Sequence, residues 1–321
     1  MLQLFRTNQL LFSLLLVFYA ALLHWGPAPA TAAASPGIWT AQLRDWITGP
    51  LARYGFGVVL LTVQATYLNY LVARDRLTRE VGQLPGLFYI LVANLLPAFL
   101  GLSGPLLANT FVIIAYGELS DTYKRAKATG SLFNAGLWLG VASLFYFGYL
   151  LFLPWVLFGS NSLRKPSARE WLVTLLGAVC AYWLVGVGYY WSDAYPYFRA
   201  AQLGQFGLLD LVGTGRWTDY LALGFVGALL LYTLGQAGRL LSRTTIDVRK
   251  KINLLYTALL FGPLVLVLQS DLGLEGLLVL AVPLGALLGI RFLGLRPAVA
   301  EAGHLLLLVA VLVWRFRRLF V

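Results

Sequence analysis

Four charged residues that lie between long apolar runs have the types needed for group transfer from a phosphate. Arg44 and Asp45 are adjacent in one such interval, and Asp193 and Arg199 lie in a later one. A carboxylate can accept a proton from an attacking hydroxyl, and arginine binds a departing phosphate through paired N–H donors. Asp45 is therefore the first candidate base, and Asp193 is the second. Arg44 and Arg199 are the candidate ligands of a substrate phosphate.

The histidines and the cysteine exclude several kinds of catalytic centre. The chain has two histidines, His24 and His304, and one cysteine, Cys180, and all three lie in or at the end of apolar runs. They cannot assemble a zinc site of the usual composition. The chain also lacks GxxxxGK(S/T), GxSxG and HExxH motifs, which leaves ATP-driven transport and serine hydrolysis without support. We predict no cofactor, and a divalent cation is the alternative, although no motif in the chain supports one.

The other acidic residues stand where solvation or helix dipoles account for them. We expect solvated loop charges at five acids near the ends of apolar runs: Asp75, Glu80, Glu118, Asp121 and Asp247. Asp271 and Glu275 open an apolar run, where acids complement the helix macrodipole. Glu301 and His304 are three residues apart on one helix and could form a proton relay, and a packed histidine is the alternative. With the acids placed in this way, we expect no pair of opposite charges buried within the membrane. The absence of such a pair counts against ion-coupled transport.

The composition is typical of a membrane protein. Of 321 residues, 60% are hydrophobic and 12% are charged, and the mean hydropathy is +0.77. Soluble domains contain about 25% charged residues, so lipid must replace water over much of this surface. The net charge of +11 does not indicate a nucleic-acid partner, because the cations stand at the ends of apolar runs and form no continuous basic face. Membrane lipids are the expected partners.

Basic residues are concentrated in every second interval between the apolar runs. The clusters are Arg74, Arg76 and Arg79; Lys124, Arg125 and Lys127; Arg164, Lys165 and Arg169; and Arg239, Arg243, Arg249, Lys250 and Lys251. The intervening intervals hold only Arg44, Arg53, Arg199 and Arg216. The positive-inside rule therefore predicts a multi-pass protein of the bacterial inner membrane with a cytoplasmic N-terminus. The first run, 9–25, followed by PAPATAAAS, also resembles a signal peptide, but we expect an uncleaved first helix.

We predict an all-α fold that forms a single transmembrane domain over residues 1–321. A bilayer core of about 30 Å needs about 20 helical residues per crossing. The sequence predicts eleven helices, at 9–25, 56–73, 86–102, 105–117, 132–144, 146–159, 171–190, 218–240, 253–268, 275–291 and 300–316. Segment 132–159 is too long for one crossing and is divided near Tyr146. Eleven crossings leave Arg315, Arg317 and Arg318 outside, against the charge rule, and ten crossings with a re-entrant segment are the alternative.

Two segments are predicted to face outward. Residues 26–55 begin with small residues and then turn amphipathic, which suits a helix lying flat on the membrane surface. Residues 192–216 form the second external segment. Within the helices, five amides are expected to hydrogen-bond between neighbours: Gln64, Asn69, Asn94, Asn109 and Asn134. Gly136 and Gly140 have the spacing of small residues at closely packed helix pairs.

Two stretches of the chain resemble known families. FNAGLWLGVASLFYFGYLLFLP, residues 133–154, resembles a segment of polytopic GT-C glycosyltransferases. RKPSAREWLVTLLG, residues 164–177, together with RTNQLLFSLLL near the start and IRFLGLRP near the end, resembles a family of uncharacterised bacterial inner-membrane proteins, a domain of unknown function. Members of that family are sometimes labelled beta-carotene monooxygenase. That label implies an iron centre with several histidine ligands, which two histidines cannot supply.

The GT-C resemblance implies a transferase that uses a polyprenyl-phosphate sugar at the outer face. It also implies an essential acid in the first external loop, a position that Asp45 matches. The chain departs from the family in its next external loop, which is only Ser103-Gly104-Pro105 and carries no acid. It also lacks the large external loop and the soluble C-terminal domain of that family.

Three functions remain open at this point. The first is a GT-C-like glycosyltransferase with Asp45 as its base. The second is a transporter or flippase of a lipid or small solute, and the third is a non-enzymatic subunit of an envelope complex. The alternative for all four candidate site residues is that they are ordinary loop charges solvating helix ends.

Overall fold

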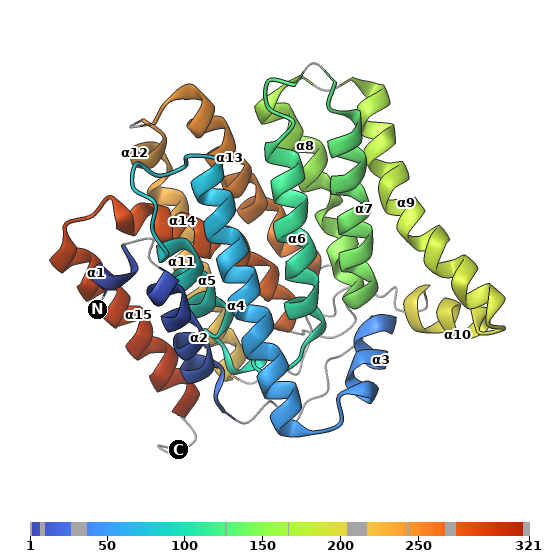
Figure 1. Ribbon diagram of the computed structural model, residues 1–321, viewed down its shortest axis with the longest axis horizontal. Helices are drawn as coiled ribbons and strands as arrows, with labels where there is room; N and C mark the ends of the chain where they lie inside the picture. Colours follow the sequence, from blue (N-terminus) through green and yellow to red (C-terminus); the bar gives the residue numbers. More distant parts are fainter. Residues whose placement is uncertain are drawn as a thin grey trace.

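The computed structural model describes residues 2–6, 10–26, 37–125, 127–165, 167–203, 217–242, 244–266 and 274–316. Regular structure in these residues is entirely helical, which confirms the all-α prediction (Figure 1). The α-helices are α1 (Leu2–Phe5), α2 (Leu10–His24), α3 (Ile38–Trp46), α4 (Pro50–Arg74), α5 (Leu84–Ala93), α6 (Gly104–Ser120), α7 (Thr129–Phe145), α8 (Leu153–Leu163), α9 (Ala168–Trp191), α10 (Tyr195–Phe198), α11 (Trp217–Gly235), α12 (Ala237–Leu241), α13 (Ile246–Phe261), α14 (Ala281–Leu293) and α15 (Pro297–Phe316).

Shorter helical turns connect several of these elements. They are η1 (Pro97–Phe99), η2 (Phe147–Phe152), η3 (Arg199–Leu203), η4 (Gly262–Leu266) and η5 (Leu274–Leu280). Some sequence predictions fall outside the described residues, namely those on residues 27–36 and 204–216 of the external segments, on Asp271, and on Arg317 and Arg318. The division of the chain into domains stays a prediction.

Within the described residues, five helices are long and apolar enough to cross a bilayer. They are Pro50–Arg74, Ala168–Trp191, Tyr220–Leu241, Leu274–Leu293 and Pro297–Trp314. Such helices indicate a multi-pass membrane protein, as the composition predicted. Helix is also present at each of the other predicted positions, in shorter segments. The number of eleven crossings therefore stays a prediction.

The predicted division of segment 132–159 near Tyr146 is confirmed. α7 ends at Phe145, Tyr146 is extended with φ −154° and ψ 108°, and η2 begins at Phe147. Close packing accompanies the break, because a Cβ on Gly148 would overlap the carbonyl oxygen of Val265 in η4. The chain thus leaves α7 and returns through η2 and α8 as a second helical segment.

The predicted close packing at Gly136 and Gly140 is also confirmed. Both residues face α9, where a Cβ on Gly136 would overlap the Thr174 carbonyl oxygen and one on Gly140 would lie 2.8 Å from that of Ala178. From the other side, a Cβ on Gly177 would overlap the Phe133 carbonyl oxygen. Small residues on both helices therefore allow the backbones of α7 and α9 to touch.

α14 is the most enclosed of the five long apolar helices. Most of Leu274–Leu293 is buried inside the protein, whereas most of α9, α11 and α15 is not. Gly285 and Gly289 of α14 pack directly on the backbone of α5 at Tyr89 and Pro85. Hydropathy cannot separate a helix at the centre of a bundle from one that faces lipid, because both are apolar on every side.

The five predicted amides do bond to neighbouring segments. Gln64 Nε2 donates to the Leu106 carbonyl at 2.7 Å, and its oxygen accepts from the Tyr89 hydroxyl at 2.6 Å. Asn109 Nδ2 donates to the carbonyl of Leu278 in η5 at 2.9 Å. The other pairs are Asn69 with Gln83, Asn94 with His24, and Asn134 with Glu118. These bonds fix the depth and rotation of helices whose apolar contacts alone are not specific.

The connections that carry the basic clusters meet at one end of the bundle. Arg164 Nη1 donates to the Arg125 carbonyl at 3.0 Å, and Lys250 Nζ donates to the Leu163 carbonyl at 3.1 Å. This end is at the top of Figure 1, and α3 and α10 lie at the opposite end. We call the two ends the basic end and the α3 end. α15 runs toward the α3 end, so the conflict between eleven crossings and the charge rule at Arg315 persists.

An exposed ion pair at the basic end gives a testable pH dependence. The Asp247 carboxylate accepts from the Tyr123 hydroxyl at 2.6 Å and from Lys124 Nζ at 3.0 Å. These hydrogen bonds lower the pKa of Asp247 below its ordinary 3.8 and raise the pKa of Lys124 above 10.5. The pair thus stabilises the fold fully between about pH 4 and pH 10. In acid, this stabilisation is lost as the pH falls through the lowered pKa of Asp247. In base, it is lost as the pH rises through the raised pKa of Lys124.

We expect Asp247→Asn to lower the thermal unfolding midpoint slightly at pH 7 and to lose that effect in strong acid. The effect is small because both side chains are more than half exposed. Unfolding of the purified protein in detergent, followed at pH 7 and below pH 3, measures both values. An equal deficit at both pH values would contradict the assignment of the shift to this pair.

Candidate functional site

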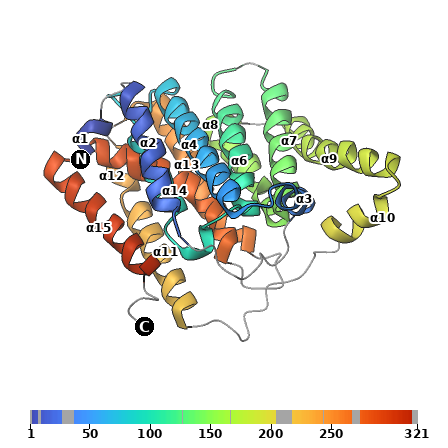
Figure 2. The ribbon, with the colours of Figure 1, turned by 60° about the horizontal axis from the view of Figure 1, so that its bottom comes forward.

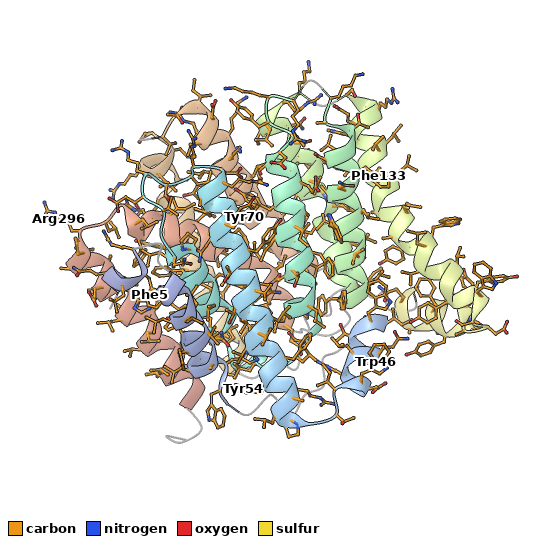
Figure 3. All side chains as sticks on the ribbon, viewed as in Figure 1. Phe5, Trp46, Tyr54, Tyr70, Phe133 and Arg296 are labelled. Carbon is orange, nitrogen blue, oxygen red and sulfur yellow. The ribbon has the colours of Figure 1, made fainter. Side chains whose placement is uncertain are left out.

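α3 is the predicted amphipathic helix of the first external segment, and it is anchored at its start. The Gly37 amide donates to the Phe145 carbonyl at 3.0 Å, and the Thr40 hydroxyl donates to the same oxygen at 2.7 Å. The amide of Ile38 donates to Gln202 Oε1 at 3.1 Å. α3 is therefore tied both to the end of α7 and to η3. Figure 3 shows Trp46, its last residue, at the same end of the bundle as Tyr54 of α4.

The two predicted external segments come together in space. Besides the bond from Ile38 to η3, Gln42 Nε2 donates to the Tyr189 hydroxyl of α9 at 2.6 Å. Ile38, Leu144 and Phe198 form a small apolar cluster between them. The packing between these segments thus comes from apolar and amide side chains, and the four charged candidates take no part in it.

Arg44 turns toward the protein from α3. Its Nε donates to the carbonyl oxygen of Leu102 at 3.1 Å, and the residue is half-buried. The carboxylate of Glu275, the second residue of η5, lies within electrostatic range of this guanidinium. Salt bridges among the described residues do not include this pair, so their nitrogen and oxygen atoms are more than 4.0 Å apart. We call Arg44, Glu275 and the Leu102 carbonyl the α3 site.

Glu275 has an unsatisfied buried oxygen. Its Oε2 is shielded from solvent and has no hydrogen-bond partner. η5 is held in place by the bond from Asn109 to Leu278 and by packing against η1. A buried carboxylate oxygen that lacks a donor among the described residues costs free energy. Glu275 was not among the predicted site residues, because an acid at the start of an apolar run is expected to complement the helix dipole.

Asp45 is placed differently from Arg44. It is exposed, and within the described part of the chain it takes part in no hydrogen bond or ion pair. Adjacent helical positions are about 100° apart around the axis, so Asp45 and Arg44 leave α3 in different directions. Arg53 of α4 closes the end of α3 by donating to the carbonyls of Ile47 at 2.6 Å and Arg44 at 2.9 Å.

Asp193 and Arg199 lie on the turn after α9. Asp193 is exposed and has a left-handed backbone with φ 55°, and its amide donates to the Tyr190 carbonyl at 3.2 Å. Arg199 is exposed at the start of η3. Neither forms a hydrogen bond or ion pair with Arg44 or Asp45, all four being described residues. Their roles as base and phosphate ligand stay predictions.

Two apolar grooves open beside these segments. The larger, the α9 groove, has a volume of about 820 Å³ and runs along α9 from Leu175 to Tyr190, with Tyr195 and Phe198 of α10 at its end. α9 leans away from the bundle at this point and α10 returns beneath it (Figure 2). The smaller, the α3 groove, has a volume of about 430 Å³ and is lined by residues of α3, α4, α6 and α7: Trp39, Leu43, Trp46, Leu60, Phe111 and Phe145. Apolar walls of this kind suit hydrocarbon chains.

Both histidines are buried and hydrogen-bonded. His24 Nδ1 lies 2.9 Å from Asn94 Oδ1, and His304 Nε2 lies 3.0 Å from the Tyr19 hydroxyl. Both imidazoles are buried. Glu301 is close enough to His304 to interact with it electrostatically, and the proton relay between them stays a prediction.

A second charged cluster lies at the basic end and corrects two expectations. Asp75 was expected to be a solvated loop charge, but its side chain is only 2% exposed and forms an ion pair with Lys251 Nζ at 2.7 Å. Arg74 Nε lies 3.3 Å from the same carboxylate oxygen. The expectation that the chain contains no buried charge pair is therefore wrong. The other oxygen, Asp75 Oδ2, and the hydroxyl of nearby Tyr116 are buried without partners.

The described residues include no group of three or more His, Cys, Asp or Glu side chains that could hold a metal ion together. The α3 site holds one carboxylate and one guanidinium, and such a pair suits a ligand with a hydroxyl and an anionic group. A search of protein-family models, of curated proteins and of solved structures found no match to this chain.

Proposed function

We propose that this protein is a multi-pass inner-membrane transferase that takes a sugar from a polyprenyl phosphate at its outer face, in the manner of GT-C glycosyltransferases. The α3 end faces outward in this proposal, and the basic end faces the cytoplasm. The observation that carries the proposal is the half-buried guanidinium of Arg44 on α3, a helix whose residues Trp39, Leu43 and Trp46 line an apolar groove.

Each part of this arrangement has a use in such a reaction. Arg44 would bind the phosphate, which gains negative charge as the sugar leaves. The α3 groove would hold the first part of the lipid chain, and the α9 groove offers a second apolar surface for a long chain. Asp45 and Asp193 are the bases that the sequence favours, and Arg199 is the second phosphate ligand. The proposal that the protein is a transferase is the same whichever of these acids is the base.

The experiment is a complementation test in a strain that lacks this protein. We expect the deletion to remove or alter an envelope glycan, and the wild-type gene to restore it. Arg44→Gln is expected to restore less than about one tenth, because a charge-assisted contact to phosphate contributes about 1.5–3 kcal/mol. Arg53→Gln is the matched control, since the hydrogen bonds of the Arg53 side chain to the described residues go to backbone carbonyls at the end of α3. Mass spectrometry of envelope glycans gives the readout.

The other two functions predict different results. An unchanged glycan profile in the deletion strain, with lipid or solute crossing liposomes that contain the purified protein, would indicate a transporter or flippase. The buried Asp75–Lys251 pair removes one argument against an ion-coupled form of that function. Stable co-purification with envelope proteins, together with full function of Arg44→Gln, would indicate a structural subunit.

A further inference from the structure

We propose that the α9 groove binds one bilayer phospholipid, with a hydrocarbon chain along α9 and a phosphatidylethanolamine headgroup at Arg199 and Asp193. This inference goes beyond the proposed function, because such a lipid would bind equally in a transferase, a transporter or a structural subunit. It gives Asp193 and Arg199 a role other than that of base and second phosphate ligand. It comes from the lining of the groove and from the two opposite charges at its end.

The groove opens along a helix that is suited to a hydrocarbon environment. α9 is long and apolar enough to cross a bilayer, and most of it is not covered by the rest of the protein. Its groove residues recur every three or four positions from Leu175 to Tyr190, so they form one face of the helix. At about 1.5 Å per residue this face is about 22 Å long, whereas one leaflet of the bilayer core is about 15 Å thick. A single hydrocarbon chain can therefore lie in the groove over the whole depth of its leaflet.

The walls of the groove present carbon surfaces. The wall opposite α9 consists of residues of η2 and α8: Phe147, Leu150 and Leu153. On α9, Tyr182 contributes its ring to the groove while its hydroxyl lies 2.7 Å from Ser143 Oγ of α7. Gly186 leaves the groove open, because even a Cβ at this position would lie 3.7 Å from the ring of Phe198. A lipid chain thus meets apolar groups on both sides.

Two charged residues flank the end of the groove that α10 closes. Tyr195 and Phe198 line this end, Asp193 stands two residues before Tyr195, and Arg199 directly follows Phe198. Consecutive Cα atoms are about 3.8 Å apart, so both charges lie close to the groove. Both residues are exposed, and neither side chain has a hydrogen bond or ion pair with the described part of the chain.

This pair of charges favours a zwitterionic headgroup. The guanidinium of Arg199 suits the lipid phosphate, and the carboxylate of Asp193 suits the ammonium group of phosphatidylethanolamine. An anionic headgroup such as phosphatidylglycerol would be attracted by Arg199 but repelled by Asp193. The charges at the groove therefore select phosphatidylethanolamine over an anionic lipid.

The test measures quenching of tryptophan fluorescence by phospholipids with brominated chains, added to the purified protein in detergent. Trp183 lines the groove and is 64% exposed, so a bound chain would lie against its ring. We expect brominated phosphatidylethanolamine to quench the fluorescence saturably. The saturable part should disappear in Trp183→Phe.

Two glycines of α9 provide matched variants. Gly186→Leu places a side chain in the groove, whereas Gly188→Leu places the same side chain where a Cβ meets no atom within 4 Å. We expect Gly186→Leu to abolish saturable quenching and Gly188→Leu to retain it. Arg199→Gln should weaken binding about fivefold, the usual effect of one basic residue near a charged lipid. Asp193→Asn should remove a preference of about fivefold for phosphatidylethanolamine over phosphatidylglycerol.

The outcomes separate a specific site from the lipid that surrounds any membrane protein. Quenching that rises in proportion to added lipid, and equally in Gly186→Leu and Gly188→Leu, would overturn the inference. Tighter binding of phosphatidylglycerol, or displacement of the phospholipid by farnesyl phosphate, would also overturn it, because the occupant would then be an anionic lipid or the proposed substrate. Where Gly186→Leu does not accumulate, saturation in the wild type and its loss in Trp183→Phe decide the question. The proposed function is decided by the glycan profile of the deletion strain, so either proposal can fail alone.

Discussion

Asp75→Asn is expected to destabilise the protein by about 3 kcal/mol, because it leaves Lys251 in a nearly closed site without its counter-charge, while Arg74 keeps its ion pair with Asp121. Asp75 is 2% exposed at the side chain, Lys251 is 16% exposed and Arg74 is 27% exposed. Removing one partner of a buried ion pair typically costs about 3–5 kcal/mol, and the partial exposure of both cations places this case at the lower end. Thermal and denaturant unfolding in detergent measure the loss.

A double-mutant cycle identifies the pair as the cause. Lys251→Met alone should also destabilise the protein, since it leaves Asp75 with only the longer contact to Arg74. The double variant Asp75→Asn/Lys251→Met should be more stable than the sum of the single effects predicts, because neither charge is then left alone. The matched control is the exposed pair Asp247–Lys124, where the same two substitutions should produce little coupling. Additive effects at Asp75 and Lys251 would show that the two residues do not stabilise one another.

The pair also joins elements that are distant in sequence. Asp75 ends α4 and Lys251 lies on α13, while Arg74 donates to Ser120 Oγ at 2.8 Å at the end of α6. One cluster thus fixes the relative positions of three helices at the basic end. A bond of this kind restricts helix movement, so the variants should also show faster backbone hydrogen exchange at the end of α4.

The parts of the fold that the sequence predicted depend on local spacing. Helix follows from long apolar runs, the break at Tyr146 from the excess length of segment 132–159, and a close helix contact at Gly136 and Gly140 from their spacing. Each rule uses neighbouring positions and no knowledge of which helices pack together. The hydrogen bonds of the intramembrane amides were predictable in kind for a similar reason, because an amide in an apolar helix needs a partner.

The two most informative acids were not predictable in this way. Asp75 stands between Arg74 and Arg76 in a polar interval, and its sequence neighbours are those of a solvated turn. It is buried because α13 supplies Lys251 from far along the chain. Glu275 opens an apolar run, and the burial of its unpartnered Oε2 follows only from the packing of η5 in the folded protein. The burial of a charge depends on tertiary neighbours, which hydropathy and spacing do not specify.

Gly136→Ala and Gly177→Ala are each expected to destabilise the contact between α7 and α9 by about 1–3 kcal/mol, the usual cost of overpacking. Each new methyl group would overlap a carbonyl oxygen of the opposite backbone, that of Thr174 for Gly136 and that of Phe133 for Gly177. A backbone carbonyl within a helix cannot turn away as a side chain can, so the helices must separate. Larger residues at these positions should cost more, since separation also removes the apolar contacts along the interface.

Gly188→Ala is the control that distinguishes this contact from a general effect on helices. Gly188 lies on the same α9, but a Cβ there meets no atom within 4 Å. Alanine favours helix over glycine by about 1 kcal/mol, so this variant should be neutral or slightly more stable. Unfolding midpoints of the three variants in one detergent provide the comparison.

The α9 groove gives a second readout, because α9 forms one of its walls and is held against the bundle through α7. Separation of the two helices should therefore weaken lipid binding in Gly136→Ala and leave it intact in Gly188→Ala. Equal unfolding midpoints for Gly136→Ala and Gly188→Ala would mean that the backbones of α7 and α9 do not touch.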